Sequence, residues 1–102
     1  MVLHLNESNF ASSIANGVAV IDFMATWCGP CKQMAPIVEK IGAEQTDIIV
    51  GKIDVDESQE IAQKYNVLSI PTIIIFKDGE AIDQFIGIVQ EKKLLEKINS
   101  LK

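Results

Sequence analysis

The sequence predicts an α/β fold in which helices cover both faces of a mixed β-sheet. Strand and helix patterns alternate along the first two thirds of the chain, and a hairpin and a helix follow, giving the order βαβαβαββα. Alternation favours parallel strands joined by right-handed crossovers, whereas a hairpin joins antiparallel strands. The length of 102 residues suits a single domain, residues 1–102, because chains usually divide only when they are two or three times longer.

The chain is expected to begin with a short strand from Val2 to Leu5, followed by a helix. Asn6 or Ser8 is the expected helix cap, because a side-chain oxygen there would accept the first free amide hydrogens. Gly17 is expected to end the helix by adopting a positive φ. The residues expected to face the core are Phe10, Ala11 and Ile14.

The segment from Val18 to Phe23 is apolar at every position except Asp22. Such a run is typical of a strand that is covered on both faces, and it therefore predicts a place near the centre of the sheet. Asp22 is the exception that requires an explanation.

A second helix is expected from Cys28 to about Ala43, because apolar residues recur at helical spacing. Pro36 removes one backbone donor and crowds the preceding turn, so we expect a bend near that residue. The apolar positions are Met34, Ile37, Val38 and Ile41.

The second half of the chain contains a strong hairpin signal at Asp78-Gly79, because a two-residue turn needs a positive φ at both positions. The other expected elements are a strand over 48–53, a helix over 58–65, strands over 72–76 and 80–86, and a helix over 90–101.

Composition and charge restrict the class of function. The net charge is −5 and the chain contains no Arg, so phosphate backbones would repel it and nucleic-acid binding is not favoured. No unbroken apolar run approaches the roughly 20 residues that span a bilayer. The segment from Met1 to Glu7 lacks the basic and apolar regions of a secretion signal, so the cytoplasm is the expected location.

Cys28 and Cys31 are the only cysteines, and several interpretations compete for them. A structural disulfide closing so short a loop would contribute only about 2 kcal/mol. A structural zinc site needs four ligands, and His4, the only histidine, lies more than twenty residues away. A carrier that binds Cu(I) through two thiolates, or a pair of inert core cysteines, remains an alternative.

A redox couple gives the spacing a mechanism. Residues three apart share one face of a helix, so the sulfurs can bond without moving the backbone. Cys28 falls at the helix start, where free amide hydrogens stabilise a thiolate, and Pro30 fits the first turn. Cys31 precedes the apolar stripe and is expected to be the more buried of the two. We therefore expect Cys28 to attack a disulfide and Cys31 to resolve the product.

Asp22 can be interpreted in two ways from its position alone. It could be an aspartate at a strand end that accepts hydrogen bonds from a turn. Alternatively, its place within an apolar run predicts a desolvated carboxyl with a raised pKa, which could take a proton from Cys31 during resolution.

The segment from Phe23 to Lys32, with its Trp-Cys-Gly-Pro-Cys motif, resembles the thioredoxin family, and the likeness extends over nearly the whole chain. Asp22, Gly51-Lys52-Ile53-Asp54, Ile70-Pro71-Thr72 and Gly87 add to it at the family's spacing. The resemblance implies the thioredoxin fold, with a central five-stranded sheet and four helices. It also implies dithiol-disulfide exchange with client proteins, re-reduction by a thioredoxin reductase and no bound cofactor or metal, and we expect a monomer.

The resemblance also implies roles for individual residues. Lys52 would be the charged neighbour of Asp22, and the Ile70-Pro71 peptide bond would be cis and would face the disulfide. The main chain of Ile70 would then pair with an extended client segment, and Gly87 would complete the groove. The other residues expected to contact the client are Trp27, Gly29 and Pro30. Without the resemblance, Pro71 and Gly87 could simply mark strand ends, Lys52 could be a solvated charge and Trp27 a core residue.

Three positions depart from the family pattern. Met24 replaces a common large aromatic residue, Thr26 replaces a frequent Glu or Pro, and Leu68 replaces a frequent basic residue. The acidic residues at 54, 56, 57 and 60 lack the glycine and closing glutamate of a calcium loop and are interpreted as a solvated helix start. We expect a protein disulfide reductase; the alternatives are a soft-metal carrier and a redox-inert binding module.

Overall fold

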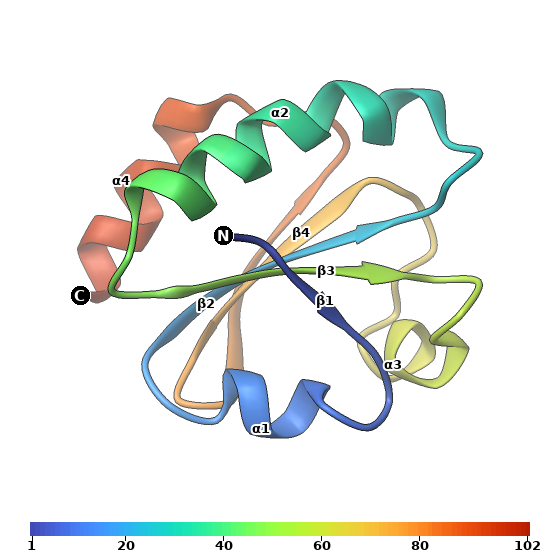
Figure 1. Cartoon of the computed structure of the whole chain (residues 1–102), viewed down its shortest axis with the longest axis horizontal. Coiled ribbons are helices and arrows are strands. Elements are labelled where there is room, and N and C mark those ends of the chain that lie inside the picture. Colours follow the sequence, from blue (N-terminus) through green and yellow to red (C-terminus); the bar gives the residue numbers. More distant parts are fainter.

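The computed structural model describes residues 1–102 and contains one mixed five-stranded sheet in the order β1-β3-β2-β4-β5 (Figure 1). The strands are β1 (Leu3–Leu5), β2 (Val18–Met24), β3 (Ile49–Asp54), β4 (Thr72–Lys77) and β5 (Glu80–Ile86). Strand β3 pairs in parallel with β1 and β2, whereas β4 is antiparallel to β2 and to β5. The predicted order of elements and the mixed sheet are confirmed.

Four helices cover the two faces of the sheet. They are α1 (Phe10–Ile14), α2 (Gly29–Glu44), α3 (Gln59–Lys64) and α4 (Glu91–Leu101). Helices α2 and α4 lie on one side of the sheet, and α1 and α3 lie on the other (Figure 1). Pro36 lies inside α2 without ending it, since the helix continues to Glu44.

Strand β2 is central and belongs to two hydrophobic cores, as its apolar sequence predicted. Val18 and Val20 pack with buried residues of α2 and α4, whereas Ala19, Ile21 and Phe23 pack in the cluster that includes α1 and α3. Because side chains alternate along a strand, a strand with a helix layer on each face needs apolar residues at both odd and even positions.

Helix α1 differs from the prediction in two respects. Its N-cap is Asn9, not Asn6 or Ser8, and Asn6 instead accepts the Ser8 amide hydrogen in the preceding turn at 2.9 Å. Ala11 is exposed, while Phe10 and Ile14 are buried. The helix has only five residues, so only Phe10 and Ile14, which are four residues apart, can face the sheet together. Ala11 lies about 100° around the helix axis from Phe10 and therefore points away from the sheet.

The hairpin between β4 and β5 is confirmed at Asp78-Gly79, with φ of 50° and 86° at the two turn residues. The turn is attached to the connection between α1 and β2, because the Gly17 N–H donates to Asp78 Oδ1 at 2.7 Å and the Asp78 N–H donates to the Gly17 carbonyl at 2.9 Å. Gly17 has the predicted positive φ, 74°, but α1 already ends at Ile14, so Gly17 does not end the helix as expected.

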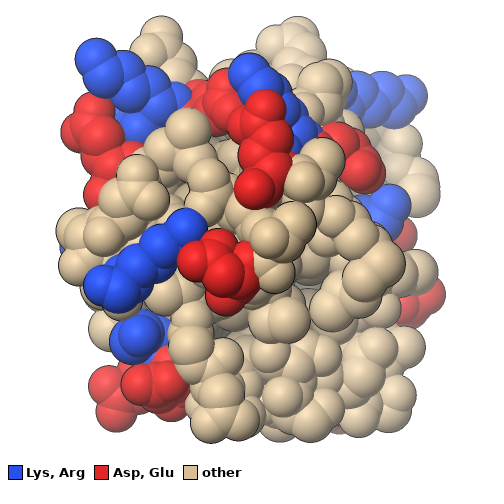
Figure 2. All heavy atoms as spheres, turned by 60° about the vertical axis from the view of Figure 1, so that its left-hand side comes forward, with Lys and Arg blue, Asp and Glu red and all other residues tan.

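The surface around α4 carries charges of both signs. Figure 2 brings this side forward and shows Lys next to Asp and Glu side chains instead of in separate patches. Three ion pairs connect α4 or the C-terminus to neighbouring elements: Lys40 with Glu91, Lys97 with Asp83, and Lys102 with Asp47. No helix combines the length and apolar character needed to cross a membrane.

The hairpin turn provides a test of the backbone argument. Gly79→Ala should lower the free energy of unfolding by about 1 to 2 kcal/mol, because φ of 86° is unfavourable for a residue with a Cβ. The nearest heavy atom to the added Cβ is 4.0 Å away, so steric contact would not contribute. Gly79→Asn should cost less, since Asn tolerates the left-handed region. Urea unfolding measures both, and equal losses for Ala and Asn would contradict the argument.

Candidate active site

The residues expected to form the site meet at one edge of the sheet. Cys28 follows the end of β2, and β3 ends beside it because the two strands are parallel. Strand β4 is antiparallel to β2, so its beginning, with Ile70 and Pro71 just before it, lies at the same edge. Strand β5 ends there too, which places Gly87 next to Pro71. The topology thus brings together segments that lie far apart in the sequence.

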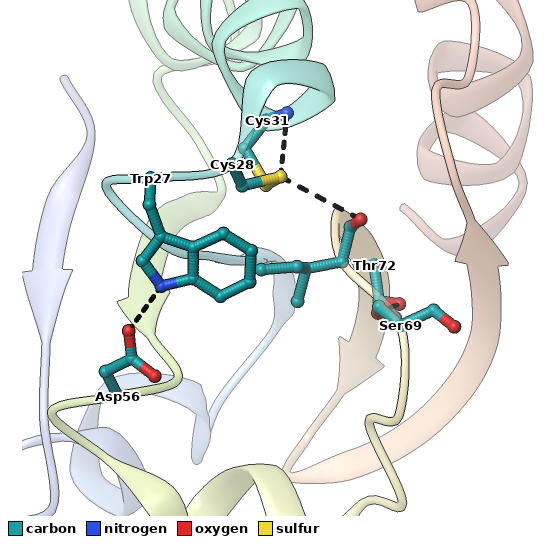
Figure 3. The surroundings of a disulfide bond; sticks show 7 residues. Trp27, Cys28, Cys31, Asp56, Ser69 and Thr72 are labelled. Carbon is teal, nitrogen blue, oxygen red and sulfur yellow. Dashed lines mark hydrogen bonds between the residues drawn. A yellow bond between two sulfur atoms is a disulfide. The ribbon is translucent and has the colours of Figure 1, made fainter.

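Cys28 and Cys31 form a disulfide at the start of α2 (Figure 3). Cys28 is the N-cap of the helix, with extended backbone angles, and its Sγ accepts the backbone N–H of Cys31 at 3.2 Å. Gly29 and Pro30 form the first helical positions, where the missing N–H of proline is not needed. The sulfur of Cys28 therefore occupies the position in which a side chain satisfies the free amides of a helix start.

The predicted difference in burial between the two cysteines is not present. Cys28 is 3% exposed and Cys31 is 4% exposed. The reason is that the disulfide draws both sulfurs into one small cluster with Ala25, against which Met24, Val55 and Ile70 pack. The contact with the helix amide, and not exposure, distinguishes Cys28 from Cys31 in this structure.

Asp22 lies in a row of core residues on the α2 side of the sheet. It follows Val18 and Val20 on the same face of β2, and its register partners are Lys52 on β3 and Ile73 on β4. Its side chain is almost fully buried, and Oδ1 has no hydrogen-bond partner in the protein. Asp22 is therefore a desolvated carboxyl at the end of β2 that leads to Cys28, and not a turn-binding aspartate.

Burial raises the pKa of Asp22 from 3.8 to about 7, and the nearby Lys52 ammonium partly opposes this shift. Desolvation is the larger cause because the charged carboxylate loses its hydration while its attraction to one cation restores only part of that energy. Lys52 is thus the charged neighbour that the resemblance implied. The carboxyl is poised to gain or lose a proton near neutral pH.

Trp27 lies at the surface and not in the core. Its side chain is 68% exposed, and its indole Nε1–H donates to Asp56 Oδ2 at 2.7 Å (Figure 3). This bond holds the ring beside the disulfide. From the sequence, Asp56 was assigned only to a solvated helix start. Asp56 follows β3 directly, and β3 ends beside the end of β2, so its position could have indicated the contact with Trp27.

The Ile70-Pro71 peptide bond is cis, as the resemblance implied. Cys28 Sγ lies 3.9 Å from the carbonyl oxygen of Ile70. Neither the N–H nor the carbonyl of Ile70 is hydrogen-bonded to another main-chain group. The turn is fixed by Thr72, whose hydroxyl donates to the Ser69 carbonyl at 2.6 Å, a contact that sequence reasoning missed (Figure 3). An unpaired stretch of main chain therefore faces the sulfurs.

Gly87 completes this edge of the site. Its φ of 87° favours glycine, and its N–H donates to the Pro71 carbonyl at 2.8 Å. Apart from Gly87 and its two neighbours in the chain, no heavy atom lies within 4 Å of the place a Cβ would occupy. Glycine is therefore favoured at this position by its backbone angle. It leaves open space beside Pro71, and no other part of the chain packs closely against it.

The donor groups of the site do not resemble a metal centre. No group of three or more His, Cys, Asp or Glu side chains is arranged to hold a metal ion anywhere in the chain. What the site contains is a pair of sulfurs, a helix amide directed at one of them, a buried carboxyl and an unpaired main-chain segment. This set suits thiol–disulfide exchange, in which a thiolate must form and a proton must move.

The buried carboxyl should make stability depend on pH. Because the folded chain holds the Asp22 proton up to about pH 7 and the unfolded chain releases it near 3.8, stability should fall by about 4 kcal/mol as the pH rises through this interval. Asp22→Asn should remove this fall, so that the variant equals the wild type near pH 4 and exceeds it near pH 8. Urea unfolding of the disulfide form measures the difference. The exposed Glu80→Gln serves as control, and parallel curves for Asp22→Asn and the wild type would contradict the assignment.

Comparison with known proteins agrees with the geometry. A sequence model of the family Thioredoxin matches residues 1–100. Thioredoxin of Chlamydia caviae is 42% identical over 99 residues, which are 97% of both chains, and thioredoxin of Staphylococcus epidermidis is 45% identical over 98 residues, which are 93% of this chain and 92% of the other. The solved structure of a mutant thioredoxin from Halobacterium salinarum superposes with a TM-score of 0.90 at 40% identity, covering 97% of this chain and 88% of that one. With the predicted fold and the Cys28–Cys31 pair in place, the chain belongs to the thioredoxin family.

Proposed function

We propose that this protein disulfide oxidoreductase reduces disulfide bonds of client proteins, with Cys28 as the attacking residue. The observation that carries the assignment of Cys28 is the 3.2 Å hydrogen bond from the Cys31 amide to Cys28 Sγ. In the reduced protein the same amide, with the positive end of α2, stabilises a thiolate on Cys28. A thiolate is both the nucleophile and a good leaving group, so the couple exchanges readily.

The reaction has two balanced steps. The Cys28 thiolate attacks one client sulfur, a Cys28–client disulfide forms, and the second client sulfur leaves as a thiolate and takes a proton. Cys31 then loses its proton and attacks Cys28 Sγ, which restores the Cys28–Cys31 disulfide and releases the first client sulfur as a thiolate. Two electrons pass to the client, which ends with two thiols.

Asp22 accepts the proton of Cys31 in the second step. It lies on the α2 side of the sheet, two residues before the end of the strand that leads to Cys28, and its pKa of about 7 matches a base that works near neutral pH. Lys52 keeps this pKa from rising further, so that a substantial fraction of the carboxyl is ionised.

Client recognition uses the unpaired main chain of Ile70. An extended client segment pairs with it as an added strand, in a manner that reads main chain more than side chains. Trp27 and the exposed first turn at Gly29 and Pro30 flank this segment on one side, and Gly87 leaves room on the other. Such contacts suit many different clients.

The Cys28–Cys31 pair itself holds the two electrons, so we assign no bound cofactor. A thioredoxin reductase reduces the Cys28–Cys31 disulfide back to two thiols. Both thiols come from one chain, so a monomer is sufficient. A protein that acts as a reductant requires a reducing compartment such as the cytoplasm. The soft-metal carrier and the redox-inert module gain no specific support, since the matched relatives are thioredoxins.

The attack order is tested with cysteine variants. The wild type should accelerate the reduction of insulin by dithiothreitol, and Cys31→Ser should accumulate mixed disulfides with insulin chains that mass spectrometry detects. Cys28→Ser should neither accelerate the reaction nor trap a client. Trapping by Cys28→Ser alone would reverse the roles, and no acceleration by the wild type would refute the reductase function.

The role of Asp22 predicts a change in the pH profile. Asp22→Asn should slow the release of client from the mixed disulfide by about 10-fold or more at pH 7 to 8, because a positioned base typically contributes at least that much. The wild-type rate should rise as the pH passes about 7, and this rise should be missing in the variant. Rapid-quench kinetics from pH 5 to 9 measure both, and an unchanged rate and profile would exclude Asp22 as the base.

A further inference from the structure

Two main-chain groups contact the sulfur of Cys28, and they act on a thiolate in opposite directions (Figure 3). The Cys31 amide donates to Cys28 Sγ at 3.2 Å, and the carbonyl oxygen of Ile70 lies 3.9 Å from the same atom. The amide stabilises negative charge on the sulfur, whereas the carbonyl oxygen repels a thiolate and accepts a hydrogen bond from a protonated thiol. Because Cys28 is only 3% exposed, little water screens either contact.

The Ile70 carbonyl is free to act on the sulfur, whereas the carbonyls on both sides of it are occupied. The Ser69 carbonyl accepts the hydroxyl of Thr72 at 2.6 Å, and the Pro71 carbonyl accepts the Gly87 N–H at 2.8 Å. No N–H of the chain donates to the oxygen of Ile70. Of three carbonyls in a row, the middle one is therefore left for the sulfur.

Thr72 fixes the direction of this carbonyl. Its main chain lies in β4, paired with Phe23 of β2 and Ile86 of β5, and the residue is 1% exposed. Ser69 is exposed, and apart from the sulfur contact no other hydrogen bond of the chain reaches the main chain of Ser69 or Ile70. The Thr72 hydroxyl is thus the one hydrogen bond that holds this part of the turn to the sheet.

We propose that Thr72 is a positioning residue that limits the ionisation of Cys28 by holding the Ile70 carbonyl against its sulfur. The inference rests on the proposed function, because it concerns the thiolate that attacks the client. A less stabilised thiolate makes the reduced form less favourable, so the same contact keeps the cysteine pair a reductant. The helix amide and the braced carbonyl together set the fraction of thiolate.

The test is a pH titration of a protein in which Cys31→Ser leaves Cys28 as the only thiol, with thiolate followed by its ultraviolet absorbance. Adding Thr72→Val keeps the β-branched shape but removes the hydroxyl. This variant should raise the acid dissociation constant of Cys28 by about 2- to 10-fold, the range that one hydrogen bond contributes. Thr72→Ser keeps a hydroxyl and should have the same constant as the parent protein.

The matched control is Ser13→Ala, which should leave the constant unchanged. It removes a hydroxyl that donates to the Asn9 carbonyl at 2.7 Å, in α1 and before the opposite end of β2. A constant that Thr72→Val leaves unchanged or lowers, or that Thr72→Ser or Ser13→Ala raises equally, would overturn the proposal.

The redox consequence is measured in the protein with both cysteines. Thr72→Val should shift the equilibrium with glutathione toward the reduced protein, by up to the same factor, because its thiolate is better stabilised. An unchanged equilibrium would overturn this part of the proposal. Insulin reduction by the wild type tests the proposed function separately, because neither the titration nor the glutathione equilibrium involves a client.

Discussion

The central position of β2 is the constraint on which the rest of the site depends. A strand whose side chains are apolar on both faces is buried between layers above and below, and its buried N–H and C=O groups therefore need a neighbouring strand on each side. Here β3 runs parallel to it and β4 runs antiparallel. The end of β3 and the beginning of β4 consequently flank the point where β2 leaves the sheet. Cys28, Asp56 and Ile70 meet because of this arrangement and not because of their spacing in the sequence.

Asp22 lowers the stability of the fold at this edge of the sheet, where the proposed mechanism uses its carboxyl as a base. An apolar residue at that position would pack with Ile73 and the α2 face without loss of hydration, as Val20 does one row earlier. A carboxyl there has one oxygen without a partner, and it lowers the stability of the folded state progressively as the pH rises from about 4 to about 7. Residues that conflict with their surroundings in this way tend to mark functional sites. The conflict also explains why one charge could be singled out from sequence alone.

The sequence predicted the elements well where one physical rule dominates. The apolar run of β2, the Asp78-Gly79 turn and the long amphipathic helices each follow from a single pattern. The prediction from sequence failed for α1, because this helix is too short for the spacing of its apolar residues to specify which side chains are buried. The equal burial of Cys28 and Cys31 was not predictable, because it arises from contacts with Ile70 and Val55, residues brought in by other strands. The bond between Trp27 and Asp56 likewise depends on strand register.

The site separates the chemistry from the choice of client. In the proposed mechanism the exchange reaction uses main-chain groups, the Cys31 amide and the free main chain of Ile70, which any extended polypeptide could approach. Selection among clients would then come from side chains at the rim of the site, where Trp27 is an exposed large apolar side chain. An apolar rim on a small protein would also favour contact between copies, but the net charge of −5 opposes that contact at long range.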